Sequence, residues 1–165
     1  MQKLYRFEVD QSIRIEELAR DTIIGIANQE QQFTLIVPSR VKRRVRETFR
    51  RSGKPKLAGP YIFAASVVCA VKKAHFRLHD LIIDKEYSGH EEHITKIINS
   101  AFPELSVYFD LIGKSSPAHA AAYFTHKKQS KPNASASAKE LQEILKQKDG
   151  QRTVTPRVYT DSQPN

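Results

Sequence analysis

Apolar residues gather in three short segments near the start of the chain, and each segment has the length of a β-strand. In residues 4–10, apolar and polar side chains alternate, which is typical of a strand with one buried face. Residues 22–27 and 33–37 are two further apolar runs, separated by a short polar turn. Because short connections suit antiparallel neighbours, these segments predict a three-stranded antiparallel meander.

The segment after the third strand has the period of a helix. Val41, Val45 and Phe49 recur every four residues, so they form a thin apolar stripe with polar residues around the rest. Ser39 is expected to cap the start of this helix, and Gly53 is expected to end it.

A second helix and a buried strand follow. Residues 62–74 are apolar nearly all round, which predicts a buried helix, although the valines of this segment leave a strand as the alternative. Residues 81–84 form a continuous apolar run that ends in charge, as in a central strand buried on both faces. A helical crossover would join the first strand to this fourth strand, so we expect the two to be parallel neighbours.

The remaining elements alternate between helix and strand. Ser88 and Glu91 form a capping box that opens a helix, residues 105–112 alternate as a fifth strand, and Ser116 with Pro117 opens a last helix. The complete order predicts an α/β fold, in which a mixed five-stranded sheet is flanked by helices. Three strands are expected to be antiparallel, and the others to be parallel and linked by helices.

Composition divides the chain into a folded domain and a polar C-terminal part. Of the 165 residues, 39% are hydrophobic and 27% are charged, so most of the chain is expected to fold. We expect one domain over residues 1–127. Residues 128–165 are expected to form a polar linker, a short helix at 137–148 and a mostly disordered tail, which offers a site for a protein partner.

Cysteine content and the apolar runs bear on the compartment. The single cysteine, Cys69, excludes an internal disulfide framework and a multi-cysteine zinc site, and it favours a reducing, cytoplasmic environment. The first ten residues lack the apolar run of a signal peptide. The longest apolar stretch, residues 61–71, is shorter than the roughly 20 residues that span a bilayer, so no membrane association is expected.

Positive charge is concentrated in one segment. The chain has 27 Lys and Arg against 18 Asp and Glu, a formal net charge of +9. Residues 40–56 contain one acid, Glu47, among many basic residues. The basic residues are Arg40, Lys42, Arg43, Arg44, Arg46, Arg50, Arg51, Lys54 and Lys56. This segment predicts contact with phosphate groups, although a solvated helix face is the alternative. Lys114 and Ser115, at the start of the last helix, are also expected to hold a phosphate.

Two short motifs carry a resemblance to a known family. The sequence VDQS at residues 9–12 resembles the aspartate-x-serine at the first strand of the ribonuclease H-like superfamily. The sequence LIIDKEY at 81–87 resembles the fourth strand of that superfamily, which also ends in an aspartate. The superfamily includes ribonuclease H, resolvases, transposases and the Argonaute nuclease domain, and the predicted order of elements is similar to theirs over residues 3–127.

The resemblance implies a site built from acids on separate strands. In this family, converging carboxylates bind two Mg²⁺ or Mn²⁺ ions, which activate a water and stabilise the leaving oxygen of a phosphodiester. Asp10 and Asp84 would be the central pair, with His119 as a further metal ligand at the start of the last helix. Glu86 or Glu47 would assist them. Taken singly, each aspartate could instead be a structural residue at a strand end.

Three functions remain open from the sequence. The first is a metal-dependent nuclease that acts on RNA or DNA and grips the backbone with the basic helix. The second is a non-catalytic nucleic-acid-binding protein on the same fold, which needs only the basic surface. The third is a protein-interaction module whose positive face meets an acidic partner.

Overall fold

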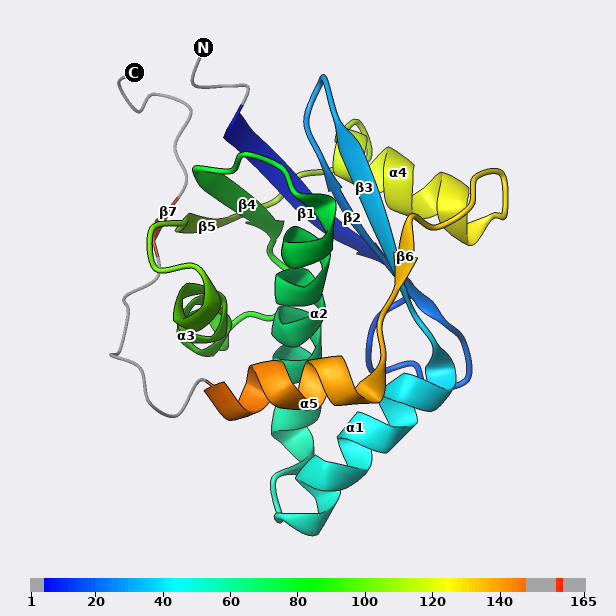
Figure 1. The fold of residues 1–165 in the computed structure, drawn as a ribbon, viewed down its shortest axis with the longest axis vertical. Coiled ribbons are helices and arrows are strands. Elements are labelled where there is room, and N and C mark those ends of the chain that lie inside the picture. Colours follow the sequence, from blue (N-terminus) through cyan, green and yellow to red (C-terminus); the bar gives the residue numbers. More distant parts are fainter. Residues whose placement is uncertain (1–4, 148–156, 159–165) are drawn as a thin grey trace.

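A mixed β-sheet with helices on both faces organises the protein, as a computed structural model of residues 5–147 and 157–158 describes it (Figure 1). The strand order across the sheet is β6-β3-β2-β1-β4-β5-β7. Strand β1 therefore lies in the middle of the sheet, next to a strand that is distant from it in sequence.

The five longer strands are arranged as the sequence predicts. Strands β1 (Arg6–Ser12), β2 (Thr22–Ala27) and β3 (Gln32–Val37) form an antiparallel meander. Strand β4 (Asp80–Asp84) is parallel to β1, and β5 (Ser106–Asp110) is parallel to β4. The predicted parallel pairing of the first and fourth strands is confirmed, and it brings the ends of β1 and β4 side by side.

Two short strands extend the sheet, so the predicted number of five strands is wrong. Strand β6 (Ala134–Ser135) pairs in parallel with β3, and β7 (Arg157–Val158) pairs in parallel with β5. The structure therefore has a seven-stranded sheet within the described residues. Strands of two residues carry no period of apolar positions, so the sequence pattern contains no signal for them.

Four α-helices lie on one face of the sheet, and one covers the other face (Figure 1). The first group is α1 (Ser39–Arg51), α2 (Ala58–Ala74), α3 (Glu91–Ala101) and α5 (Ala138–Gln147), with a 3₁₀ turn, η2 (Pro55–Leu57), leading into α2. The opposite face carries α4 (Pro117–His126).

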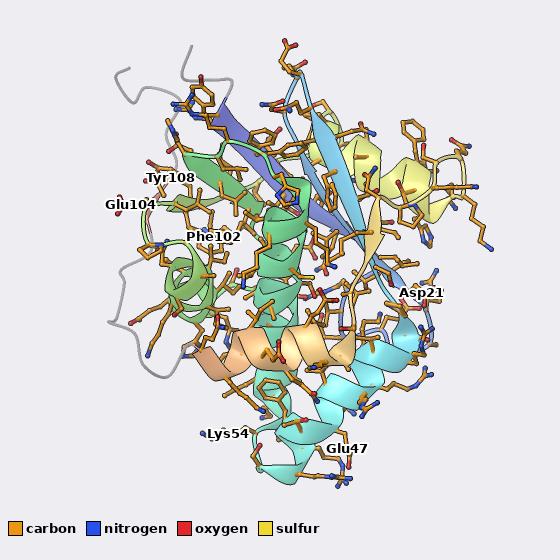
Figure 2. All side chains as sticks on the ribbon, viewed as in Figure 1. Asp21, Glu47, Lys54, Phe102, Glu104 and Tyr108 are labelled. Carbon is orange, nitrogen blue, oxygen red and sulfur yellow. The ribbon has the colours of Figure 1, made fainter. Side chains whose placement is uncertain are left out.

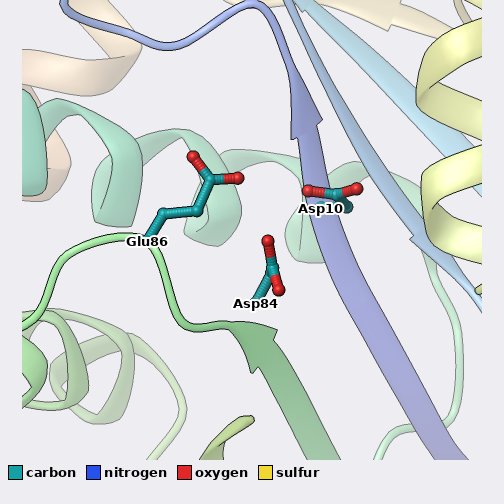
Figure 3. A group of neighbouring side chains, drawn as sticks. All are labelled: Asp10, Asp84 and Glu86. Carbon is teal, nitrogen blue, oxygen red and sulfur yellow. The ribbon is translucent and has the colours of Figure 1, made fainter. Parts of the chain in front are cut away.

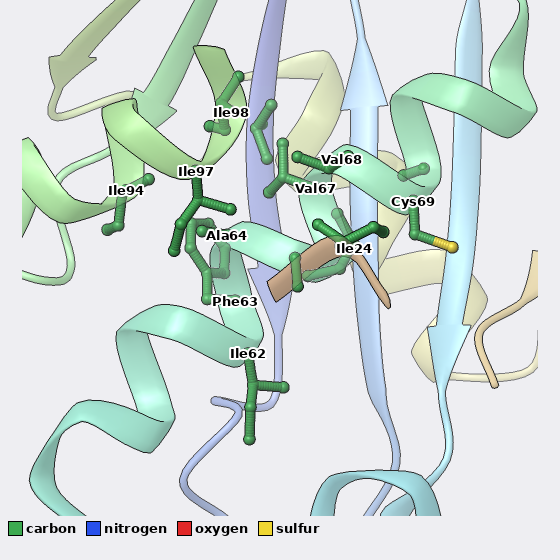
Figure 4. Packing of buried hydrophobic residues seen from close by; sticks show 14 of the residues in the cluster. Ile24, Ile62, Phe63, Ala64, Val67, Val68, Cys69, Ile94, Ile97 and Ile98 are labelled. Atoms are coloured by element: carbon green, nitrogen blue, oxygen red, sulfur yellow. The ribbon is translucent and has the colours of Figure 1, made fainter. Parts of the chain in front are cut away.

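Helix α2 forms the centre of the core, which confirms the predicted buried helix over the strand alternative. All its residues from Ala58 to Val71 are buried. It packs against α3 through the isoleucines Ile94, Ile97 and Ile98 (Figure 4). Among the described residues, Pro55–Ala74 is the one helical segment long and apolar enough to cross a membrane, and 72% of its most apolar stretch is buried inside the fold.

Helix α4 packs closely on the opposite face because β2 has no side chain at the contact. A Cβ added to Gly25 would lie 2.6 Å from the carbonyl oxygen of Ala118. The predicted cap of α4 is confirmed, since the Ser116 hydroxyl accepts hydrogen bonds from the N–H groups of Ala118 and His119. Gly25 and Ser116 together fix the position of the first turn of α4.

The predicted capping box at the start of α3 is wrong. The helix begins at Glu91, after His90, and the Glu91 carboxylate accepts a hydrogen bond from Gly89 N–H at 2.7 Å. Gly89 has a φ of 88°, a left-handed conformation that turns the chain before the helix can start.

The chain beyond residue 127 adds two elements to the same core. Strand β6 joins the edge of the sheet, and α5 packs on α2 with Leu141 and Ile144 buried. The predicted capping box of this short helix is confirmed by reciprocal hydrogen bonds between Ser137 and Glu140. Apart from β7, the predicted disordered tail lies outside the described residues.

Candidate metal centre

Three neighbouring parallel strands each carry an aspartate at or near their carboxyl end: β4 and β5 end in one, and Asp10 lies two residues before the end of β1. Val9 of β1 is paired with Ile83 of β4, so the next residues, Asp10 and Asp84, are neighbours. Asp84 is in turn in register with Asp110 of β5. In parallel strands, residues in register point to the same face, so these three carboxylates share one face at the carboxyl edge of the strands.

A cluster of three carboxylates lies at this edge, formed by Asp10, Asp84 and Glu86 (Figure 3). One ligand oxygen from each lies within 4.8 Å of the others, and no other group of this kind occurs in the described part of the chain. Asp10 is 5% exposed, and Asp84 and Glu86 are half-buried. Glu86 belongs to the turn after β4, where its N–H donates to the Asp84 carbonyl at 2.9 Å.

Hydrogen bonds hold one oxygen of each carboxylate in place. Gln11 N–H donates to Asp10 Oδ1 at 2.8 Å, and Ile112 N–H donates to Asp84 Oδ1 at 3.2 Å. The Gln11 side-chain amide donates to Glu86 Oε2 at 2.9 Å. The backbone and side chain of one residue, Gln11, thus orient two of the three acids.

His119 contacts the cluster from α4. Its Nδ1 lies 2.8 Å from Asp10 Oδ2, and its ring is partly exposed. The Ser116 cap that places His119 also donates to Glu8 Oε1 at 3.2 Å. His119 is therefore bonded to one acid of the cluster rather than being one of the three mutually close groups, and the geometry favours Glu86 as the third ligand.

Burial and mutual repulsion shift the proton equilibria of these acids. Burial, reinforced by the Asp10 and Asp84 carboxylates, raises the pKa of Glu86 to about 7. Burial also raises the pKa of Asp10, although the hydrogen bonds from His119 and Gln11 oppose that shift. The nearest cation to Glu86 is Arg14, whose Nε lies 3.9 Å from the carboxylate. The cluster is thus short of positive charge, and a bound cation would supply it.

A hollow of about 510 Å³ lies beside Glu86. Arg14, Arg46 and Lys56 line it together with the first residues of α2. Arg46 and Lys56 form no ion pair with any residue between 5 and 147 or at 157–158. Arg46 and Lys56 thus line the same hollow as Glu86, one of the three acids of the cluster.

The basic helix does not present all its predicted phosphate contacts. Lys42 is fully buried, and its Nζ donates to the Glu17 carbonyl at 2.6 Å and to Thr22 Oγ1 at 2.9 Å. The prediction that Lys42 contacts phosphate is therefore wrong. Its methylene stem lies in the interior, where its ammonium finds two oxygen acceptors.

The other predicted basic residues are exposed, and they differ in their contacts. Arg43 donates to the Leu18 carbonyl at 2.9 Å, and Arg50 and Arg51 both pair with Glu47. The contacts with Arg50 and Arg51 lower the pKa of Glu47 to about 2. Glu47, which Figure 2 labels on α1, lies outside the acidic cluster. Also exposed are Arg40, Arg44, Arg46, Lys54, Lys114 and Ser115.

Sequence reasoning missed the residues that support the acids. Tyr87 is buried, accepts a hydrogen bond from the Gln11 amide at 3.1 Å and donates to Glu16 Oε1 at 2.8 Å. Glu8 precedes Asp10 by two positions, so the period of the strand could have placed it on the same face. No sequence signal predicts the long-range contacts of Gln11, because they depend on the loop after β4.

Comparisons with known proteins do not identify a family. No family model, no curated protein and no solved structure matches this chain.

Proposed function

We propose that this protein is a metal-dependent nuclease with a ribonuclease H-like fold. The observation that carries the proposal is the group of three carboxylates, Asp10, Asp84 and Glu86, at the ends of two adjacent parallel strands. The order of an antiparallel meander followed by two parallel strands supports the proposed fold.

The donor set fits a hard divalent cation. All three ligands are carboxylate oxygens, which Mg²⁺ and Mn²⁺ prefer, and the raised pKa of Glu86 reflects a site crowded with negative charge. Asp10, Asp84 and Glu86 would hold the ion. When bound, such an ion lowers the pKa of a coordinated water and offsets the charge that develops on a phosphodiester.

His119 is suited to handling a proton beside these acids. Its Nδ1 is held by Asp10, which orients the ring and leaves Nε2 as the second nitrogen able to exchange a proton. The ring is 35% exposed, so a substrate oxygen or a water can reach it. We assign it the role of a proton carrier rather than that of a necessary metal ligand.

Cations on both sides of the cluster would bind the nucleic-acid backbone. Arg46 and Lys56 line the hollow next to Glu86, and Lys114 and Ser115 precede the first turn of α4. Phosphate groups are favoured at the start of a helix because the helix dipole adds to the lysine charge. The other exposed arginines of α1 would add non-specific attraction.

Cleavage of labelled RNA and DNA with Mg²⁺ or Mn²⁺ tests the proposal. We expect cleavage by the wild type and its loss on addition of EDTA, together with loss in Asp10→Asn and Asp84→Asn. Absence of cleavage by the wild type would refute a nuclease, and undiminished cleavage by either variant would refute the acidic cluster as its catalytic site. Salt-sensitive binding without cleavage would instead identify a non-catalytic nucleic-acid-binding protein.

The contribution of the basic helix has a matched control within α1. Arg46 and Arg44 are both exposed, but only Arg46 lines the hollow beside Glu86. Arg46→Ala is expected to raise the KM for nucleic acid more than Arg44→Ala does. Equal effects would mean that α1 acts only through its total charge.

A further inference from the structure

Helix α4 carries an exposed aromatic surface next to the candidate metal centre. In the described part of the chain, three large hydrophobic side chains are exposed, and two of them are adjacent on this helix: Tyr123, 44% exposed, and Phe124, 47% exposed. Exposed apolar groups that lie side by side, unlike single scattered ones, can mark a contact surface.

Tyr123 belongs to a ladder of stacked groups that begins at the metal centre. Its ring lies parallel to that of His119, with centroids 6.2 Å apart and an interplanar angle of 14°. The Lys127 ammonium lies 5.7 Å from the Tyr123 ring on the next turn. Because residues four apart share one face of a helix, these three side chains form a single stripe. The stripe leads away from Asp10, which His119 contacts.

Positive charge continues this stripe beyond the end of α4. A hollow of about 680 Å³ there is lined by Lys128 and Lys131, by His126, and by Arg20, which pairs with Glu17; Asp21 is the acid among its lining residues. The surface thus pairs a flat aromatic ring near the acids with cations farther along, a combination that matches the alternation of bases and phosphates in a nucleic-acid strand.

We propose that the stripe His119–Tyr123–Lys127 binds an unpaired nucleic-acid strand, with a base stacked on Tyr123 and phosphates at the lysines. The base must be unpaired, because a base inside a duplex exposes only its edge to a protein. To stack on an aromatic side chain, a base needs one of its flat faces free. As a statement about the substrate of the metal centre, this inference rests on the proposed nuclease function.

The composition of the stripe favours a nucleic acid over a protein partner. The buried centres of protein interfaces are depleted in charged residues, whereas Tyr123 lies between His119 and Lys127, and Lys128 and Lys131 line the hollow beyond. Complementary charge therefore selects a polyanion.

Binding measurements in EDTA test the stripe without cleavage. Fluorescence anisotropy would compare single-stranded RNA, single-stranded DNA and a blunt duplex of the same sequence. We expect Tyr123→Ala to weaken binding of at least one single strand roughly 5- to 100-fold, with little change for the duplex. Tyr123→Phe, which keeps the ring, should bind like the wild type.

Phe124→Ala is the control, since Phe124 is about as exposed as Tyr123, lies off the stripe and contacts the Tyr123 ring only in a T-shaped arrangement, with centroids 5.8 Å apart. It should weaken binding much less than Tyr123→Ala. Unchanged single-strand binding by Tyr123→Ala, an equal loss for the duplex, or an equal loss in Phe124→Ala would overturn the proposal. So would a change in oligomeric state in Tyr123→Ala, which would assign the surface to protein contact.

The two proposals fail in different ways. If wild type never cleaves but Tyr123→Ala still loses single-strand affinity, the nuclease proposal fails and the stripe stands. If wild type cleaves and Tyr123→Ala binds single strands normally, the stripe fails and the nuclease stands.

Discussion

The basic helix α1 and the acidic cluster at the ends of β1 and β4 both concentrate charge of one sign, but the chain compensates them differently. In α1, Lys42 is buried and has two oxygen acceptors, and Arg50 and Arg51 share Glu47. In the cluster, Asp10, Asp84 and Glu86 face one another, and the pKa of Glu86 rises to about 7.

We interpret the charge of the first kind as structural and propose that the charge of the second kind binds a ligand. A charged side chain with protein partners contributes to the fold, whereas crowded acids without enough cations destabilise it unless something binds. The net charge of +9 pointed to α1 as the functional surface, whereas burial and neighbouring carboxylates raise the pKa of Glu86 in the acidic cluster.

The largest expected effect comes from removing one charge of the cluster. Asp84→Asn should lower metal-dependent cleavage by about 1,000-fold or more, equivalent to roughly 4 kcal/mol, because the ion loses a central ligand. Asp110→Asn is the matched control, since Asp110 is in register with Asp84 but exposed and outside the group of three. Steady-state cleavage rates of both variants provide the measurement. An equal loss in the two would mean that total negative charge, rather than the cluster, supports activity.

The next effect tests the structural side of the comparison. Lys42→Ala should reduce the free energy of unfolding by about 3 kcal/mol, because it removes a buried stem and leaves the Glu17 carbonyl and the Thr22 hydroxyl without their donor. Arg44→Ala, an exposed change on the same helix, should stay within about 0.5 kcal/mol of wild type. Urea denaturation measures both, and similar stabilities for the two variants would contradict the structural role of Lys42.

A smaller effect concerns how much the acidic cluster lowers the free energy of unfolding of the metal-free protein. The pKa of Glu86 is raised above its ordinary value, so the folded state favours the protonated carboxyl. The free energy of unfolding therefore has its full contribution from Glu86 below about pH 4.5, and this contribution is lost as the pH rises through 7. Glu86→Gln does not ionise, so at pH 8 without metal it should be more stable than wild type by about 2 kcal/mol. At pH 4.5 the difference should nearly vanish. A variant that is less stable than wild type at pH 8 would contradict the crowding of negative charge.

The pattern of apolar residues predicted most of the fold, because the burial of each helix or strand determines which of its own residues are apolar. The alternation in β1, the continuous run in β4 and the apolar length of α2 each follow from the layer that the element occupies. Strand β6 and the start of α3 escaped prediction, since a two-residue pairing and the left-handed Gly89 depend on the surrounding structure.

The candidate site was predictable only in part. Asp10 and Asp84 follow from strand ends that the topology brings together, whereas the choice between Glu86, Glu47 and His119 depends on side-chain positions. Lys42 shows the same limit, because charge in a sequence does not reveal whether a lysine finds acceptors inside the fold.

Direct titration of the metal-free protein with Mn²⁺ tests the central claim, that the acidic cluster is a cation site. At pH 8, isothermal calorimetry should show saturable binding to wild type and at least a tenfold weaker affinity in Asp84→Asn. Wild-type binding should also weaken below pH 7, because Glu86 must then lose a proton before it can hold the ion. No saturable binding by wild type, or equal affinity in Asp84→Asn, would contradict the account.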